Sequence, residues 1–438
     1  MHQLLQLQST VQTASGHPCT VETFLGGGGQ GEVYRAQLGG KPIALKWYFP
    51  EQATPAQQQN LDTLIRKGPP SPAFLWPVEL AAASGVPGFG YIMPLRAPRY
   101  KGIVDLMKRR IEPSFRALTT AGLQLAQSFL ELHAQGLCYR DISFGNVFFD
   151  PDTGDIQVCD NDNVAIDGQG NSGVLGTPRF IAPEVVRGEA APSIQTDLFS
   201  LAVLLFYLFH IHHPLEGQQE AAIKCFDLPA MNKLYGTDPL FIFDPANDAN
   251  RPVPGLHDNP LAYWPIYPQF LRDRFTRAFT VGLHDPHARI RESEWRAALV
   301  QLRDAILYCG QCGAENFYDG EALRASGGQP GACWSCQRPL TLPFRLRLGR
   351  DVIMLNHDTQ LYPHHLDPQR LYDLSQPVAV IQQHPQNPNL WGLKNLTTAK
   401  WVITTTDGTI HDVEPGRSVG LAVGVKINFG PVEGEIRI

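Results

Sequence analysis

The stretch Tyr139-Arg140-Asp141-Ile142-Ser143-Phe144-Gly145-Asn146 decides how this chain of 438 residues is interpreted. It places the carboxylate of Asp141 five residues before the amide of Asn146. A carboxylate can accept the proton of an attacking hydroxyl, and an amide oxygen is a suitable hard ligand for Mg²⁺. An expected short strand, residues 156–159, then leads to Asp160. The spacing therefore predicts a metal ion held beside a hydroxyl substrate.

Two motifs that can hold phosphate groups lie upstream of this stretch. The first fits G-x-G-x-x-G-x-V, in which missing side chains let backbone N–H groups approach phosphate oxygens. Its glycines are Gly26, Gly28 and Gly31. The second is an expected strand, residues 43–46, that ends in Lys46, whose ammonium group can reach the α and β phosphates of a nucleotide. Taken singly, a hairpin turn and an exposed strand lysine explain these features equally well.

Three further motifs follow in a fixed order. Gly176-Thr177-Pro178 precedes Ala182-Pro183-Glu184, and Thr196-Asp197 opens an apolar run, residues 198–209, that predicts a helix buried on all sides. Asp285-Pro286-His287-Ala288-Arg289 closes the region. Each motif is modest evidence alone, but chance does not explain all of them in this order.

Together these motifs make residues 21–305 resemble a eukaryotic-type (Hanks-type) serine/threonine protein kinase. The resemblance implies an α+β, bilobal kinase fold with an N-lobe over residues 1–95 and a C-lobe over residues 96–307. It also implies transfer of the γ-phosphoryl group of ATP to a Ser or Thr hydroxyl of a protein substrate, with Mg²⁺ or Mn²⁺ as cofactor. We therefore expect an ATP-dependent protein kinase in a signalling system.

The same resemblance implies a role for each matching residue. Asp141 would be the catalytic base, Lys46 the nucleotide anchor, and Asn146 and Asp160 the metal ligands. The phosphate loop would use Gly26, Gly28 and Gly31, and the nucleotide pocket would use Val33, Ala44, Met93 and Leu95, the last two from the hinge, residues 91–95. Glu184 would pair with Arg289, and Asp197 would brace the catalytic loop.

One departure from the kinase pattern concerns the partner of Lys46. Kinases pair this lysine with a glutamate on the following helix, but no Glu occurs between residues 52 and 78. Counting along the chain leaves Asp62, Gln57 and Gln58 as alternatives. A shorter or neutral partner would hold the lysine less firmly, because an amide offers no ion pair.

Other departures affect positioning and regulation. Tyr139, Ser143 and Asn161 stand where kinases have His, Lys and the Phe of D-F-G. The groups for lysine, base and metal chemistry remain, so we expect an active enzyme. The alternative is a catalytically weak or inactive pseudokinase, acting as a nucleotide-binding scaffold that recruits phosphoproteins. Ser172 and Thr177 are candidate phosphorylation sites.

The segment at residues 308–341 has the cysteine spacing of a zinc ribbon. Two CxxC pairs are separated by twenty residues, and two such turns complete a tetrahedral S₄ shell. The four ligands would be Cys309, Cys312, Cys333 and Cys336. A closed shell predicts a structural Zn²⁺ rather than a catalytic one, and the intervening loop is too acidic for nucleic acid. An adaptor role fits better.

Residues 342–438 alternate in short runs that predict an all-β sandwich. Leu348–Leu355 and Gly424–Gly430 resemble the first and last strands of a forkhead-associated (FHA) domain. The resemblance implies phosphothreonine binding through Arg350; docking or packing on the kinase is the alternative. Kinases with such a tail resemble a bacterial subgroup in tellurite-resistance-linked gene sets. A phosphatase and a von Willebrand A-type protein are therefore candidate partners.

Composition excludes several classes of partner and location. The net charge is -6 and charged residues make up 18% of the chain, so no general basic field exists to hold nucleic acid or an anionic membrane. The longest apolar run, residues 198–209, is too short to span a bilayer. The first twenty residues lack the pattern of a secretory signal. We therefore expect a cytoplasmic protein.

Overall fold

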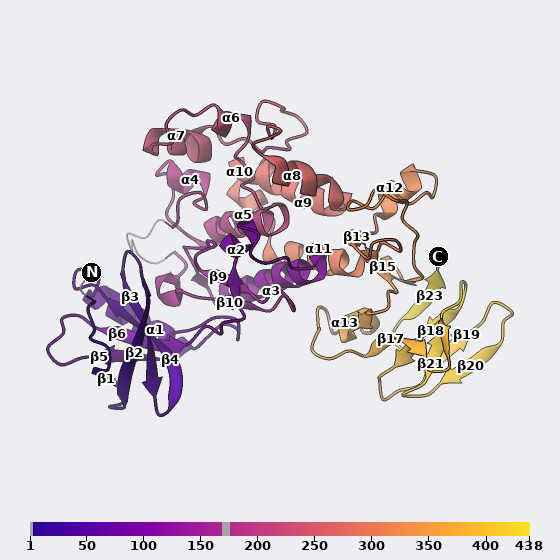
Figure 1. Cartoon of the computed structure of the whole chain (residues 1–438), viewed down its shortest axis with the longest axis horizontal. Coiled ribbons are helices and arrows are strands. Elements are labelled where there is room, and N and C mark those ends of the chain that lie inside the picture. The colour runs from indigo at the N-terminus through magenta and orange to yellow at the C-terminus, as the bar shows by residue number, and fades with distance from the viewer. Residues whose placement is uncertain (1–2, 169–175) are drawn as a thin grey trace. The chain divides into compact units, whose positions relative to one another are not determined.

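The computed structural model describes residues 3–168 and 176–438 of the chain (Figure 1). These residues divide into two units. The first comprises Met1–Tyr263 and Arg274–Arg296, and the second comprises Trp264–Asp273 and Ala297–Ile438. Helices α9 (Gln269–Phe279) and α11 (Glu292–Asp304) have residues in both units.

The first unit begins with a closed antiparallel barrel whose strand order is β1-β2-β3-β4-β6-β5. Its strands are β1 (Thr10–Thr13), β2 (Pro18–Gly27), β3 (Gly31–Leu38), β4 (Lys41–Tyr48), β5 (Glu79–Ala82) and β6 (Gly90–Pro94). Alternate apolar side chains such as Val21, Tyr34 and Leu45 fill its interior. Sequence patterning did not identify β1, which pairs with both β2 and β5 and so closes the barrel.

Helix α1 (Pro55–Lys67) follows β4 and carries the positions expected to face Lys46. It begins where the side chain of Thr54 accepts a hydrogen bond from the backbone N–H of Gln57. It ends at Gly68, whose φ of 75° suits a residue without Cβ. Leu61 and Leu64 form the buried face, so the register of the helix is fixed by packing.

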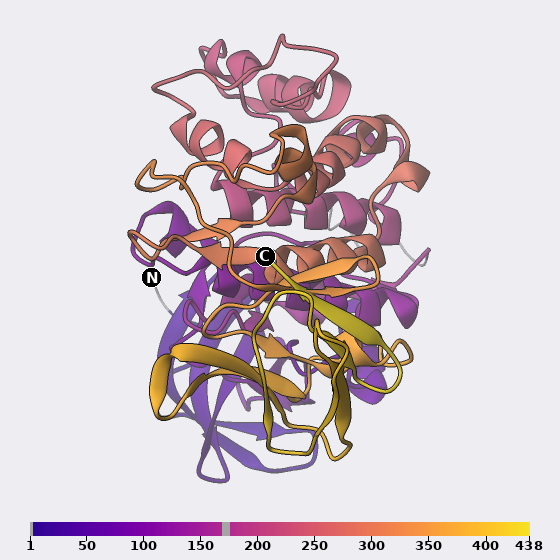
Figure 2. The same cartoon turned by 90° about the vertical axis from the view of Figure 1, so that its right-hand side faces the viewer.

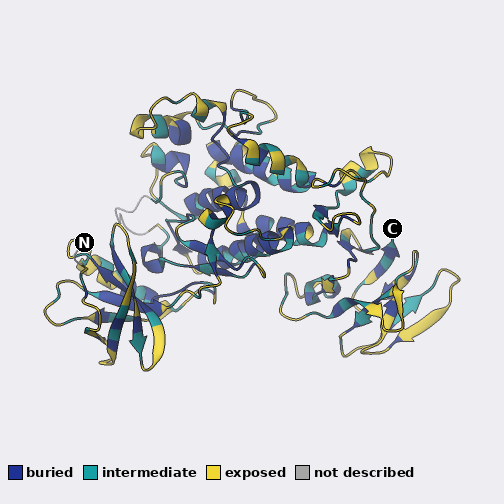
Figure 3. Cartoon of the chain, viewed as in Figure 1, coloured by how far each residue is buried: buried dark blue, intermediate teal, exposed yellow. Residues whose placement is uncertain are grey.

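The helical part of the first unit is built around α3 (Phe115–Ala134) and α5 (Ile194–His210). Every residue of α5 from Thr196 to His210 is buried, as the uniformly apolar run predicted (Figure 3). Gly136 takes a φ of 69° just after α3. The shorter helices are α2 (Ile103–Met107), α4 (Pro183–Val186), α6 (Gln218–Ala221), α7 (Leu228–Asn232), α8 (Asp258–Tyr263) and α10 (Val281–His284).

Short strands position the loops between these helices. Strand β8 (Leu137–Cys138) pairs with β11 (Ala165–Ile166), and β7 (Lys101–Gly102), β9 (Val147–Phe149) and β10 (Ile156–Val158) form a sheet in the order β10-β9-β7. The segment 139–146 therefore runs between β8 and β9, and Asp160 follows β10. Among the described residues, no helix combines the length and apolar character needed to cross a membrane.

The second unit contains a small cysteine-bearing segment and an all-β region (Figure 1 and Figure 2). The segment has strands β12 (Ile306–Tyr308) and β13 (Glu315–Phe317) and helix α12 (Gly320–Ala325). The all-β region has two sheets, in the orders β15-β14-β23-β22-β19-β20 and β16-β17-β18-β21. Side chains such as Leu346, Leu393 and Trp401 form one core from both sheets. The predicted all-β tail is therefore observed.

The elements of the all-β region are short, and most were not resolved one by one in the sequence. They are β14 (Arg345–Leu348), β15 (Asp351–Met354), β16 (Gln360–Leu361), α13 (Pro363–Leu366), β17 (Ala379–His384), β18 (Asn387–Asn395), β19 (Trp401–Thr404), β20 (Ile410–Val413), β21 (Ser418–Gly420), β22 (Lys426–Asn428) and β23 (Glu433–Arg437).

Candidate active site

Helix α5 holds the loop between β8 and β9 in place through Asp197. One carboxylate oxygen of Asp197 accepts the backbone N–H of Tyr139 at 2.5 Å, and the other accepts that of Arg140 at 2.9 Å. Asp197 is almost fully buried, so it fixes the loop without competition from water. This is the bracing expected of Asp197.

Asp141 and Asn146 face each other across this loop. The Asn146 side-chain amide donates to the backbone carbonyl of Asp141 at 2.9 Å and to its Oδ2 at 3.2 Å. The hydroxyl of Thr177 donates to Asp141 Oδ1 at 2.6 Å. Burial raises the pKa of Asp141, although the hydrogen bonds from Thr177 and Asn146 oppose the shift. The loop thus presents an oriented carboxylate in a partly desolvated place.

Hydrogen bonds join this loop to the end of β10. The backbone N–H of Cys159 donates to the carbonyl of Asn146 at 2.8 Å, and the hydroxyl of Tyr139 donates to the carbonyl of Cys159. Tyr139, which stands where kinases have histidine, therefore ties the loop between β8 and β9 to the residue before Asp160. Asp160 itself has a φ of 54° and begins the 3₁₀ turn η1 (Asn161–Asn163).

Lys46 forms ion pairs with two carboxylates. Its Nζ donates to Asp160 Oδ1 at 2.5 Å and to Asp162 at 2.9 and 3.0 Å for the two oxygens. It also donates to Gln30 Oε1 at 3.2 Å. The Lys46 side chain is 5% exposed. Both carboxylates come from the turn after β10, so none of the ion partners of Lys46 is on α1.

The predicted partners of Lys46 are therefore wrong. Asp62 and Gln58 are exposed on α1. Gln57 is turned inward, but its side-chain amide donates to the hydroxyl of Tyr48 at 3.0 Å and to the backbone carbonyl of Asp162 at 3.1 Å. The physical reason is that α1 presents neutral amides, which bind the main chain of η1, while η1 supplies the carboxylate.

Sequence reasoning missed Asp162, although a signal was present. The segment Asp160-Asn161-Asp162 has an aspartate where the D-F-G pattern has glycine. Compared with the kinase pattern, the chain thus has an additional carboxylate after β10 and lacks the glutamate on α1. Asn161 also has a defined role, because its amide donates to the carbonyls of Leu75 and Val158 at 2.9 and 3.0 Å.

The charges of this network shift the pKa values of its members. Burial would lower the pKa of Lys46, but the charges of Asp162 and Asp160 outweigh it and raise the pKa. Burial and the charge of Asp162 raise the pKa of Asp160 to about 6. For Asp162, the charge of Lys46 outweighs burial and lowers the pKa. Lys46 and Asp162 are thus the firmly ionised pair.

The glycine loop lies between β2 and β3 and meets the same network. A Cβ at Gly31 would be 2.1 Å from the backbone oxygen of Trp47, so this position requires glycine. Gly26 and Gly28 face open space, with no atom within 4 Å of such a Cβ. At the tip, the amide of Gln30 donates to Asn163 Oδ1 at 2.8 Å. The loop therefore bends toward η1 in this structure.

The four residues expected at the nucleotide base come together in one apolar cluster. Ala44 and Met93 are buried in it, and Val33 and Leu95 pack against them partly exposed. Val33 lies on β3, Ala44 on β4 and Met93 on β6, which pairs with β4 so that Ala44 and Met93 are direct partners. The site is thus apolar at one end and charged at the other.

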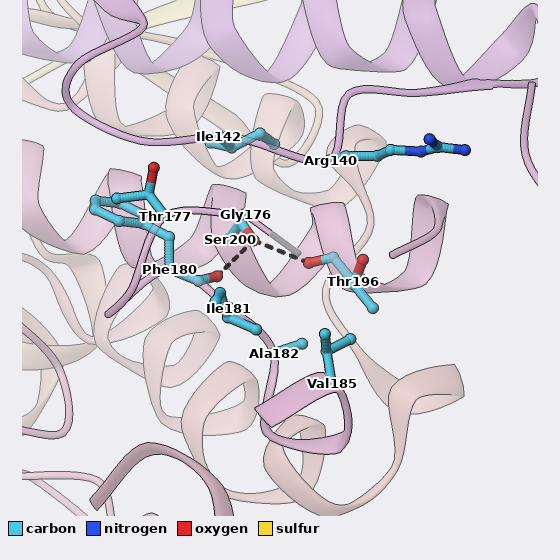
Figure 4. A pocket seen from close by; sticks show the side chains of 10 residues that line it. All are labelled: Arg140, Ile142, Gly176, Thr177, Phe180, Ile181, Ala182, Val185, Thr196 and Ser200. Carbon is cyan, nitrogen blue, oxygen red and sulfur yellow. Dashed lines mark hydrogen bonds between the residues drawn. The ribbon is translucent and has the colours of Figure 1, made fainter. Parts of the chain in front are cut away.

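The segment that begins at Gly176 is anchored on α5. The hydroxyl of Ser200 donates to the carbonyls of Phe180 and Thr196 at 2.6 and 3.2 Å (Figure 4). Thr177, Phe180, Thr196 and Ser200 line a small pocket whose free volume of about 10 Å³ suffices for about one water molecule. Glu184 and Arg289 form the expected buried pair, with N to O distances of 2.8 and 2.7 Å. Ser172 lies outside the described residues.

The four cysteines of the second unit converge as their spacing predicted. Their Sγ atoms all lie within 4.8 Å of one another, and Cys309 to Cys336 and Cys312 to Cys333 are each 3.7 Å apart. This distance is too long for a disulfide. It matches the edge of a tetrahedron with Zn–S bonds of roughly 2.3 Å, which is about 3.8 Å. The thiols therefore fit a four-coordinate Zn²⁺.

A second cluster in this unit does not fit a metal. Asp304, His364 and His365 bring ligand atoms within 4.8 Å of one another. However, Nδ1 of His365 accepts the backbone N–H of Tyr362 at 2.8 Å. The proton of the neutral ring is then on Nε2, which lies 3.2 Å from Asp304. His365 is thus a hydrogen-bond donor to Asp304 rather than a ligand.

Comparison with known proteins agrees with this geometry. Residues 97–252 match the family model of the protein kinase domain. The chain is 31% identical over 210 residues to the DNA damage-responsive serine/threonine-protein kinase RqkA of Deinococcus radiodurans, covering 46% of this chain and 31% of that protein. It is 30% identical over 136 residues to the cell cycle serine/threonine-protein kinase CDC5/MSD2 of Saccharomyces cerevisiae, covering 28% of this chain and 19% of that protein.

A third relative is the protein kinase MCK1 of Saccharomyces cerevisiae, which is 26% identical over 173 residues, 39% of this chain and 43% of that protein. The chain thus spans less than half of the length of each of these three relatives. Over residues 97–252 the chain is therefore similar to protein kinase domains, and two of these relatives are serine/threonine-protein kinases by name.

Proposed function

We propose that the kinase domain of this chain transfers the γ-phosphoryl group of ATP to a Ser or Thr hydroxyl of a protein substrate. One observation carries the proposal: hydrogen bonds, together with one peptide bond, connect the groups that this reaction needs. Asn146 bonds to Asp141 through its side chain and to Cys159 through its carbonyl. The next residue, Asp160, bonds to Lys46.

Each residue has a role that follows from its surroundings. Asp141 accepts the proton of the substrate hydroxyl, and its oriented carboxylate holds that hydroxyl in line for attack. Lys46 and the backbone N–H groups of the glycine loop fix the phosphates. Mg²⁺ bound by Asn146 and Asp160 would neutralise charge that develops on the transferred group. Both ligands offer hard oxygen donors, which this ion prefers.

The test is phosphate transfer from labelled ATP to the chain itself and to a generic basic protein. Asp141→Asn and Lys46→Met should each abolish transfer, because one removes the base and the other the phosphate anchor. Asp152→Asn makes the same chemical change at an exposed position between β9 and β10 and should leave the rate unchanged. Equal rates for all three variants would contradict the proposal.

The rival function is a nucleotide-binding scaffold. One observation favours it: Gln30, Asp160 and Asp162 contact Lys46 in the place where phosphates would bind. The two functions differ in one measurement on the unaltered chain. ATP binding without any phosphate transfer would support the scaffold, whereas transfer would support the enzyme.

For the second unit we propose structural Zn²⁺ and partner docking. The four thiols enclose the ion without an open position, so the metal would hold this small segment together. Arg350 is exposed in the turn between β14 and β15, which suits contact with a phosphothreonine peptide. The FHA resemblance suggests phosphothreonine proteins as partners, and the gene-set analogy suggests a phosphatase and a von Willebrand A-type protein.

Docking is tested with a phosphothreonine peptide library and its unphosphorylated counterpart. Selective binding that is lost in Arg350→Ala, but kept in Arg347→Ala on strand β14, would support phosphopeptide recognition. Equal binding of both libraries would contradict it and leave a packing role for the sandwich.

A further inference from the structure

We propose that Asp162 is the positioning residue for Lys46 and takes the part that a helix carboxylate plays in other kinases. This inference rests on the proposed function and names the group that orients its phosphate anchor. Asp162 follows Asp160 by two residues, and both carboxylates reach the same ammonium group. The two carboxylates contact the same lysine, but their surroundings give them different roles.

Exposure separates the two carboxylates. The side chain of Asp160 is 33% exposed, so it faces the open part of the site. The side chain of Asp162 is 0% exposed and lies behind Lys46. A metal ion and phosphates can approach Asp160 from solvent, whereas Asp162 has no such access. When Asp160 turns to a metal, Asp162 remains as the anion that holds Lys46.

Asp162 is itself held on several sides. The hydroxyl of Tyr48, two residues after Lys46 on β4, donates to Asp162 Oδ2. Gln57 and Asn60 of α1 each donate a side-chain amide to the backbone carbonyl of Asp162 at 3.1 Å. A buried carboxylate with these partners has little freedom. Asp162 therefore links α1 to Lys46, so the placement of α1 determines where the ammonium group is held.

The sequence explains why the carboxylate can come from η1. Helix α1 offers amides on its inward face, and its one acidic residue, Asp62, is exposed. Asp160 has a left-handed backbone conformation and is followed by the 3₁₀ turn η1. This turn directs the side chain of Asp162 toward β4. The glycine usually found there has no side chain, so this arrangement depends on the aspartate.

A purely structural role is the competing explanation, and kinetics separate the two. Asp162→Asn keeps the shape and removes the charge. We expect its kcat to fall by about ten- to a hundredfold, the loss for a hydrogen bond to a charged group, while its affinity for adenosine, which has no phosphate for Lys46 to hold, changes by less than threefold. Asp162→Glu should recover part of kcat. Asp62→Asn, the same change on α1, should match the unaltered chain.

A second measurement does not depend on activity. Urea unfolding of the full chain is followed for Asp162→Asn, Lys46→Met and the double variant. If the two residues pair in solution, the double variant should unfold at a higher urea concentration than the sum of the single shifts predicts, because neither charge is left buried alone. The pair Asp62→Asn and Lys46→Met should be additive.

These outcomes distinguish the inference from the proposed function. If the unaltered chain transfers no phosphate, the proposed function fails, and the urea cycle still reports whether the pair exists. If transfer occurs but Asp162→Asn keeps its full kcat, the inference is overturned. Additive urea shifts for Asp162 and Lys46 would also overturn it, because they would show that the two side chains act independently.

Discussion

His133 on α3 connects two buried carboxylates, and its replacement should make stability less dependent on pH. Its Nε2 lies 3.2 Å from Asp197, and its Nδ1 bonds to Glu292. The side chain is 5% exposed. Burial would lower the pKa of His133, but the bonds to Asp197 and Glu292 outweigh it and raise the pKa from 6.5 to about 9.

The shift predicts both the size and the pH range of the effect. Below pH 6.5 the folded and unfolded chains both hold the proton on His133, and the full contribution of this residue to the free energy of unfolding is present. Between pH 6.5 and 9 only the folded chain keeps it, so the contribution falls as the pH rises. A shift of this size corresponds to about 3 kcal/mol of unfolding free energy at most.

The assay compares His133→Gln with the unaltered chain by urea unfolding between pH 6 and 9.5. Hydrogen exchange of residues 115–134 reports on the unit that contains α3. The variant should be less stable by up to about 3 kcal/mol at pH 6, and the difference should shrink toward pH 9.5. A His133 difference that stays constant with pH would refute the reasoning.

Three further changes have expected outcomes. Gly31→Ala should lower the melting temperature of the first unit and weaken ADP binding, because its Cβ would lie 2.1 Å from the Trp47 backbone. Gly28→Ala, at a position facing open space, should change the melting temperature little. Calorimetry measures the melting temperatures, and fluorescence titration measures ADP binding. Glu184→Gln leaves Arg289 buried without its anion, and this should lower the free energy of unfolding measured in urea by about 3–5 kcal/mol. A loss below about 1 kcal/mol is the size found for exposed ion pairs and would contradict the prediction. Removal of metal by a chelator, or Cys333→Ser, should lower the melting temperature of the second unit and release about one Zn²⁺ per chain in metal analysis; an unchanged transition would argue against a structural metal.

The sequence predicted those features that depend on local patterns. The apolar period of α3 and the uniformly apolar α5 are each contained in one segment, so their burial could be predicted without knowing any neighbour. The same holds for the loop from Tyr139 to Asn146, where spacing alone places carboxylate and amide together. The cysteine pairs also needed only their spacing.

Features that depend on contacts between distant segments were not predictable in the same way. The partner of Lys46 was sought on the helix that follows it, but the carboxylate lies more than a hundred residues further along the chain at Asp162. Strand β1 has the sequence Thr-Val-Gln-Thr, in which a single apolar residue gives no period-two pattern. In both cases the deciding information is which segments meet in space.

Closure of the barrel by β1 has a practical consequence for work on isolated fragments. A fragment that starts at Val21, where the kinase resemblance begins, would lack β1 and the first part of β2. The backbone groups of β5 that pair with β1 would then face solvent, and free strand edges promote self-association. Fragments intended for crystallisation or screening should therefore keep Thr10–Thr13, even though this strand contributes no side chain to the proposed chemistry.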